Sequence, residues 1–171
     1  MKPELAATAL CVGIAALGAL WDVFTRRIPN LLTLGGLALG VTMHTALGAL
    51  DGVEGALRGA GFALLGALLC GILPAIGFAR GEMGGGDVKL FAAIGAMLGP
   101  SLGFDAQAFT FVIVLLVLWP FRLVRAGAFS ALLKRIAFGA KAPAVEVAPV
   151  VLGPAIFCGL CLSLLRHGAL R

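Results

Sequence analysis

Six stretches of this chain contain no Asp, Glu, Lys or Arg, and all of them are predominantly apolar. A backbone lying in lipid must satisfy its own hydrogen bonds, so an isolated segment of this kind crosses a membrane as a helix. Crossing takes roughly 20 apolar residues, with about 17 as the lower end. The uncharged stretches are residues 5–21, 28–50, 59–79, 90–104, 106–121 and 147–165. They predict an all-α integral membrane protein with six transmembrane helices, of which the fourth and fifth are short.

The composition excludes an ordinary water-soluble domain. Hydrophobic residues make up 61% of the 171 residues and charged residues 12%, and the mean hydropathy is +1.09. The net charge of +5 could indicate nucleic acid, but the basic residues lie between apolar stretches rather than along one polar face. We therefore expect the lipid bilayer, and no nucleic acid, as a partner.

The Lys and Arg residues are divided unevenly between the two sides of the predicted bundle. Nine of the 13 fall in the first, third and fifth loops, beginning with Arg26 and Arg27. Basic loops are retained in the cytoplasm, so these loops should face the cytoplasm and both termini the opposite side. Asp22 and Asp87 then share the cytoplasmic side. The remaining four basic residues are Lys2, Arg58, Arg166 and Arg171.

The fifth loop is long and contains an amphipathic pattern. Phe129, Leu132, Leu133 and Ile136 recur at helical spacing beside Lys134 and Arg135. This pattern predicts a cytoplasmic helix on the membrane surface between the fifth and sixth spans, held by anionic lipid and apolar contact. Substrate binding is the alternative role.

Small residues should form the contacts between helices. The chain has 25 glycines, and small residues let membrane helices approach closely. Residues 59–66 and 95–99 are expected contacts of this kind. His44, inside the second span, is expected to be a hydrogen-bond partner between helices.

All four cysteines lie in apolar stretches, where a free thiol behaves as a small hydrophobe. We expect no disulfide, no metal and no cofactor. Cys158 and Cys161 form a C-x-x-C on one helix face, which leaves a redox or metal role as the alternative.

Two aspartates stand at the borders of predicted spans. Asp22 closes the first, where it could simply pair with Arg26 or be exposed, and Asp87 opens the fourth after a glycine run, where it could simply cap the helix. Ionisable groups at the membrane are nevertheless functional candidates, and these two lie on the same predicted side. Together they suggest a catalytic pair.

A pair of neighbouring carboxylates has a well-defined chemistry. The two cannot both ionise cheaply and therefore share a proton, so one can act as base while the other acts as acid. In peptide hydrolysis, the base would activate water and the acid would donate to the carbonyl oxygen and later to the amine. Gly84, Gly85 and Gly86 lack Cβ atoms, so a substrate strand could lie against them. Lys89 could contact substrate or extend to the interface.

The residues around both aspartates resemble a known family. Asp22 is followed by Arg27-Ile28-Pro29-Asn30, and Asp87 lies in the segment Gly84-Gly85-Gly86-Asp87-Val88-Lys89-Leu90. These segments closely resemble the signatures of type IV prepilin peptidases, and the second contains the G-x-G-D of intramembrane aspartyl proteases. The resemblance continues through residues 91–95 and 149–159.

This resemblance implies a peptidase of the bacterial inner membrane with its active site facing the cytoplasm. It would remove the short basic leader of type IV prepilins, cutting after a Gly ahead of the pilin's hydrophobic helix, with Asp22 and Asp87 as the catalytic residues. Longer members carry an N-terminal extension with cysteine pairs and methylate the new N-terminus. Residues 1–171 are expected to form a single peptidase domain without that extension or activity, similar to the short form associated with Flp, or tight-adherence, pili.

Three other functions are compatible with parts of the pattern. A protease of signal-peptide remnants shares G-x-G-D but gives no reason for Arg-Ile-Pro-Asn after the first aspartate. A small transporter or channel would place its acidic groups near mid-membrane. A noncatalytic assembly subunit would hold pilin precursors without cutting them.

Overall fold

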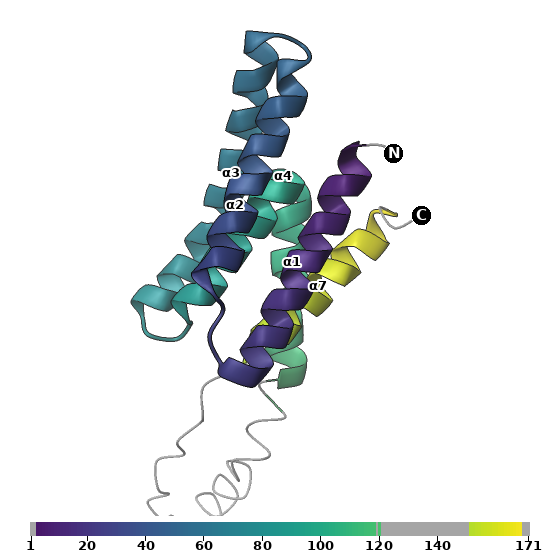
Figure 1. Cartoon of the computed structure of the whole chain (residues 1–171). Helices are drawn as coiled ribbons and strands as arrows, with labels where there is room; N and C mark the ends of the chain where they lie inside the picture. The colour runs from purple at the N-terminus through teal and green to yellow at the C-terminus, as the bar shows by residue number, and fades with distance from the viewer. Residues whose placement is uncertain (1–2, 119, 121–150, 169–171) are drawn as a thin grey trace, which may run out of the picture.

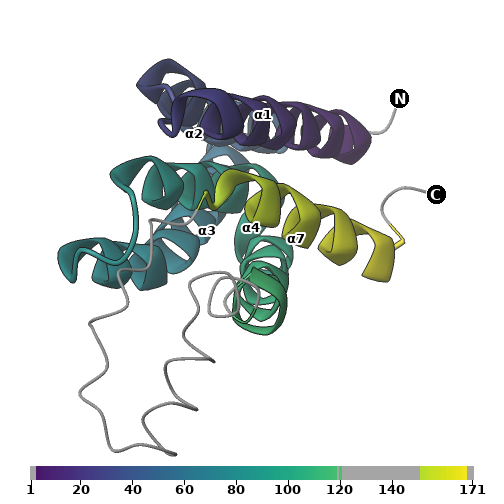
Figure 2. The ribbon, with the colours of Figure 1, turned by 90° about the horizontal axis from the view of Figure 1, so that it is seen from below.

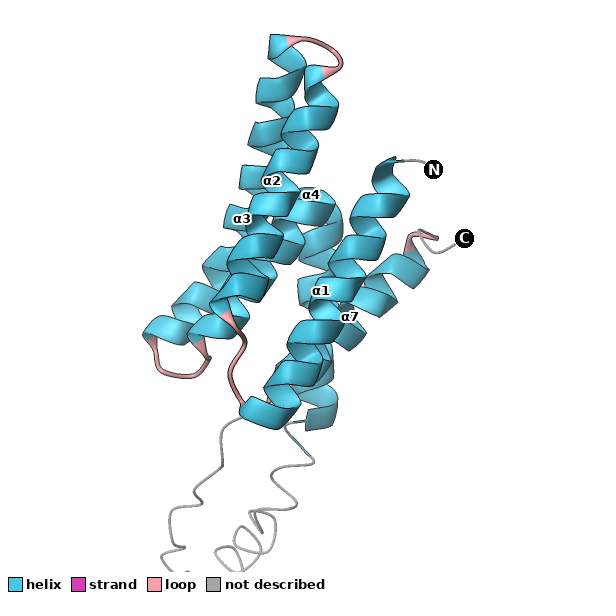
Figure 3. Ribbon diagram, in the orientation of Figure 1, coloured by secondary structure: helices cyan, strands magenta, loops and turns pink. Residues whose placement is uncertain are grey.

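The computed structural model describes residues 3–118, 120 and 151–168, and this part of the chain is built from helices joined by short loops, with no strand (Figures 1 and 3). The predicted all-α class is therefore confirmed. The predicted surface helix at residues 129–136 lies outside the described residues. The elements are α1 (Pro3–Thr25), α2 (Asn30–Ala49), α3 (Val53–Ala79), α4 (Gly85–Ile113), the π-helix η1 (Val114–Leu118) and α7 (Gly153–Arg166).

Four helices within the described residues are long and apolar enough to cross a membrane, against six predicted spans. They are α1, α2, α3 and the continuous stretch formed by α4 and η1, whereas α7 is apolar but has only 14 residues. Large apolar side chains cover the outside of these helices. Leu31 is 87% exposed and Leu68 is 59% exposed, a surface that suits lipid rather than water.

The fourth helix is folded back on itself at Gly99. This residue has φ 79° and ψ 178°, a backbone conformation that essentially only glycine adopts. A Cβ on Gly103 would lie 2.9 Å from Cα of Gly95, whereas residues eight apart in a straight helix are separated by about 12 Å. The predicted boundary between the fourth and fifth uncharged stretches, at Asp105, was therefore wrong. The break falls at Gly99 and Pro100, and Asp105 lies inside α4.

Glycines let α3 approach α4 closely, as predicted. A Cβ added to Gly66 would collide with the backbone of Gly95 and would lie 3.0 Å from that of Gly99. The neighbouring helix α2 approaches α4 in the same way. A Cβ added to Gly40 of α2 would lie 2.7 Å from the carbonyl carbon of Ala96. These backbone-to-backbone contacts fix the position of the first half of α4, which carries Asp87.

Polar side chains inside the bundle form hydrogen bonds between helices. His44 Nε2 lies 3.0 Å from the carbonyl oxygen of Met97, which confirms its predicted role as a hydrogen-bond partner. Gln107 donates to the carbonyl of Cys70 at 3.0 Å. The four cysteines are free thiols, and Cys158 is exposed on the outer surface.

The helices alternate in direction, so several of their ends meet at one end of the bundle. The end of α1, the start of α2, the α3–α4 loop and the start of α7 all lie there, while the N- and C-terminal ends lie at the other (Figure 1). Seen from that end, α7 lies alongside α1 and packs against α4 (Figure 2). Segments from four parts of the chain thus lie together at this end of the bundle.

Candidate active site

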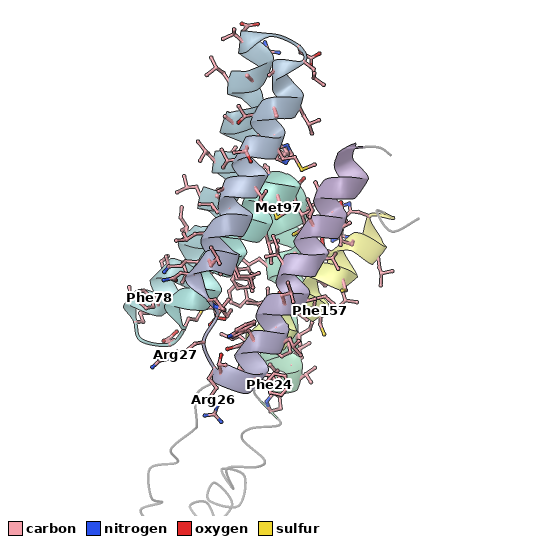
Figure 4. The ribbon with its side chains drawn as sticks, viewed as in Figure 1. Phe24, Arg26, Arg27, Phe78, Met97 and Phe157 are labelled. Atoms are coloured by element: carbon pink, nitrogen blue, oxygen red, sulfur yellow. The ribbon has the colours of Figure 1, made fainter. Side chains whose placement is uncertain are left out.

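Asp22 lies in the last turn of α1 and is buried, with 7% of its surface exposed. The helix ends at Thr25, and the next residue, Arg26, adopts φ 53° in the left-handed region. Arg26 and Arg27 lie at the lower end of the bundle in Figure 4. The alternative reading of Asp22 as the partner of Arg26 is not supported, because no ion pair between them forms in the described part of the chain.

The Asp22 carboxylate is held by the last helix. The backbone N–H of Gly153, the first residue of α7, donates a buried hydrogen bond of 2.8 Å to Oδ2 of Asp22. A Cβ on Gly153 would lie 2.8 Å from Cβ of Asp22 and 3.0 Å from Cα of Ala19. Only glycine therefore lets the two helices approach closely enough for this bond.

Asp87 lies in the first turn of α4 and is also buried, at 8% exposed. The helix is capped by Gly84, whose carbonyl accepts a hydrogen bond of 3.1 Å from the backbone N–H of Asp87. Oδ2 of Asp87 would lie 3.1 Å from a Cβ on Gly84, so the carboxylate lies close to the residue that precedes the helix. An acidic group in the first turn of a helix is favourable, so Asp87 does contribute to the helix start. Its side chain nevertheless faces a cavity.

Two cavities are lined by both aspartates. The first, of about 300 Å³, is bounded by Asp22, Arg26, Arg27, Ile28, Asn30, Gly84, Gly85, Gly86 and Asp87. The second, of about 290 Å³, is bounded by Asp22, Arg26, Gly81, Glu82, Met83, Gly84, Asp87, Val151 and Leu152. The carboxylates thus stand between two adjoining spaces. A polypeptide crossing from one space to the other would pass both of them.

The three glycines of the predicted substrate-binding set line the first cavity. They are also tightly packed. A Cβ on Gly86 would lie 3.2 Å from Cβ of Ile28, and one on Gly85 would lie 3.3 Å from the ring of Phe78. Their small size therefore serves helix packing and keeps the cavity open.

Lys89, the fourth predicted substrate-binding residue, is not among the residues that line either cavity. Its ammonium donates a hydrogen bond of 2.8 Å to Oδ1 of Asn30 at the start of α2. Asn30 itself lines the first cavity. Lys89 therefore contacts a residue of the cavity wall but does not line the cavity itself.

An apolar groove of about 470 Å³ lies between α1 and α2 next to the first cavity. Its walls include Trp21 and Pro29, the immediate neighbours of cavity residues Asp22, Ile28 and Asn30. Gly35 and Gly36 lie at its side. The groove extends from the site toward the middle of the bundle along two helices whose outer surfaces are apolar.

Sequence reasoning did not identify Gly153 or Glu82 as part of the site. Gly153-Pro154 has the pattern of a helix start, but nothing local connects it to Asp22. Glu82 had only its closeness to the glycine run as a signal. Within residues 3–118 and 151–168, no three His, Cys, Asp or Glu side chains are grouped as metal ligands would be.

The fold and the site together define an apolar helical bundle with two buried carboxylates at one end, one in the last turn of α1 and the other in the first turn of α4. A family model described as the type IV leader peptidase family matches residues 9–123. The chain belongs to this family, and its general activity is that of a peptidase acting on prepilins. Searches of curated proteins and of solved structures returned no match.

Proposed function

We propose that this protein removes the short N-terminal leader of Flp-like type IV prepilins, cutting after a Gly at the cytoplasmic face of the bacterial inner membrane. The observation that carries the proposal is the position of Asp22 and Asp87. They come from different helices, yet both are buried and line the same two cavities. An aspartyl site needs this arrangement, because its two carboxyl groups must reach one water and one peptide bond.

In the proposed reaction, the ionised carboxylate takes a proton from water while the water oxygen bonds to the scissile carbonyl carbon. The protonated partner donates to the carbonyl oxygen. Collapse of this intermediate breaks the C–N bond, and the leaving amine takes up a proton from the pair. The hydrogen bond from Gly153 holds the Asp22 carboxylate in place, and the first turn of α4 positions Asp87. This fixed arrangement reduces the reorganisation needed for each step.

Substrate binding in this proposal uses the first cavity and the groove beside it. Gly84, Gly85 and Gly86 let the substrate backbone approach Asp87, and Lys89 acts through Asn30. The hydrophobic segment that follows the leader would lie in the apolar groove that begins at Trp21 and Pro29. This segment is already in the bilayer, so it enters the groove from lipid without crossing water.

The proposed topology has six crossings with both termini outside the cytoplasm. The fold of α4 at Gly99 supports it, because the two halves run in opposite directions and bring Val114–Leu118 back to the end that carries Asp87. Arg26 and Arg27 lie at that same end (Figure 4), as expected for the cytoplasmic side. A transporter is less well supported, because both carboxylates stand at helix ends rather than at mid-membrane.

The catalytic assignment is tested with single carboxamide variants in lipid vesicles. Asp22→Asn and Asp87→Asn preserve side-chain shape and remove the acid–base group, so each should lower leader cleavage at least about a hundredfold. Asp51→Asn is the matched control, because Asp51 is an exposed carboxylate in the α2–α3 turn at the other end of the bundle. Wild-type cleavage by either site variant, at equal expression, would refute the aspartyl mechanism.

We further propose cleavage without methyl transfer. Purified protein incubated with prepilin and labelled S-adenosylmethionine should release leader and leave the new N-terminus unlabelled. Mass spectrometry of the mature product distinguishes the two results by one methyl group. A methylated product would contradict the assignment to the short form.

A further inference from the structure

The two cavities that adjoin the carboxylate pair differ in charge. Both contain Asp22, Asp87 and Arg26, so these three groups do not distinguish them. The first cavity adds Arg27, a cation. The second adds Glu82, an anion. The side of the pair that contains Glu82 is therefore more negative by two formal charges than the side that contains Arg27.

Glu82 is held at the cavity wall by its backbone. Its N–H donates a hydrogen bond of 2.9 Å to the carbonyl of Gly77 at the end of α3. The next residue, Met83, packs against the same glycine, with Sδ 2.9 Å from where a Cβ on Gly77 would lie. Both contacts anchor the α3–α4 loop, so the position of Glu82 relative to Asp87 is set by α3 and α4.

Among the described residues, the Glu82 carboxylate forms no ion pair. The ion pairs formed among the described residues involve Glu54 with Arg58, and Asp105 with Arg166 and His167. All of them lie away from this cavity. The cavity also offers apolar walls from Met83, Val151 and Leu152. An acidic head beside an apolar wall is complementary to a long basic side chain, which buries its methylene stem and pairs its charged end.

We infer that the cavity containing Glu82 is the subsite for a Lys or Arg side chain of the substrate close to the scissile bond, and that Glu82 determines this specificity. The inference rests on the proposed function, since it concerns the same carboxylate pair. It also sets the direction of the substrate. The basic segment lies on the Glu82 side, the scissile bond lies at Asp22 and Asp87, and the following segment leaves past Ile28 and Asn30 into the apolar groove.

The test uses three synthetic precursor peptides that differ at a single position, within two residues of the scissile bond. At this position the peptides carry Lys, Gln or Glu. Full-length enzyme in vesicles is assayed as wild type, Glu82→Gln and Glu82→Lys. For Glu82→Gln, kcat/KM on the Lys peptide should fall about threefold to tenfold through KM, the range expected of one partly exposed ion pair. For the same variant, kcat/KM on the Gln peptide should change less than about twofold. Glu82→Lys should cleave the Glu peptide with a higher kcat/KM than the Lys peptide.

Salt and a second variant separate charge recognition from a structural effect. Raising the ionic strength to about 0.5 M should narrow the wild-type preference for Lys over Gln, because screening weakens an exposed pair. Glu54→Gln removes an exposed acid at the opposite end of α3 and should leave the preference unchanged. Equal losses on the Lys and Gln peptides in Glu82→Gln would overturn the subsite while leaving the peptidase intact. Absence of cleavage of all three by wild type would overturn the proposed function as well.

Discussion

The backbone N–H of Gly153 donates a 2.8 Å hydrogen bond to Oδ2 of Asp22. The first N–H groups of any helix lack partners within the helix, and a side chain just before the helix often supplies one. Leu152, which precedes α7, has no such group. Asp22 of α1 takes that role instead. One contact therefore satisfies the start of α7 and fixes the orientation of a proposed catalytic carboxylate.

Gly153→Ala should reduce leader cleavage about a hundredfold with little change in KM. The added Cβ has no room beside Asp22 and Ala19, so the carboxylate must move, and displacements of about 1 Å at a catalytic group have effects of this size. The measurement is steady-state kinetics of the variant in vesicles.

A second variant in the same helix tests whether this loss is specific. Gly159→Ala would crowd Thr110 and Ala106 of α4, away from the carboxylates, and should lower thermal stability without a comparable loss of kcat in the folded fraction. Similar losses of kcat in both variants would mean that general packing of α7, and not the bond to Asp22, controls activity.

Lys89 and Asn30 should act as one unit. Lys89→Met and Asn30→Ala each remove the same 2.8 Å hydrogen bond, and each should raise KM about twofold to threefold. Because the bond can be lost only once, the double variant should be no worse than either single one. A double-mutant cycle on KM checks this. Additive effects would indicate that Lys89 contacts the substrate independently of Asn30.

Gly99→Ala should destabilise the protein by about 1–3 kcal/mol from backbone strain alone. The backbone there has φ 79°, and an added Cβ would also meet the ring of Phe62. Reversible unfolding in mixed micelles measures the loss. Gly71→Ala is the matched control, since its nearest neighbour would be Cβ of Ala92 at an ordinary 3.6 Å. Equal stability of the two variants would argue against the chain reversal at Gly99.

Gly66→Ala should separate α3 from α4 and lower stability by about 1–3 kcal/mol, the usual effect of overpacking. The obstacle is the backbone of Gly95 and Gly99, which cannot rotate away as a side chain could. Gly61→Ala, on the same helix with nothing within 4 Å, should be neutral or slightly stabilising. Thermal unfolding of the two variants side by side provides the comparison.

The break in the fourth helix shows that uncharged stretches predict helices but not the points at which the chain turns. They predicted helices because lipid leaves the backbone no other partners, and the described residues are indeed helical. They placed a boundary at Asp105, since charge defined the stretches. The turn lies instead at Gly99 and Pro100, because backbone conformation and close packing, not charge, decide where a chain can reverse.

The amino-acid order by itself determined the helical class, the apolar surface and the family, and it singled out Asp22 and Asp87, because these properties depend on local composition and on short motifs. Only the tertiary structure decided that Gly153 donates a hydrogen bond to Asp22, that Lys89 bonds to Asn30, and that Glu82 and Arg27 line different cavities next to the pair. Such relationships depend on how distant helices pack. No local pattern encodes a distance between segments that meet only when the bundle closes.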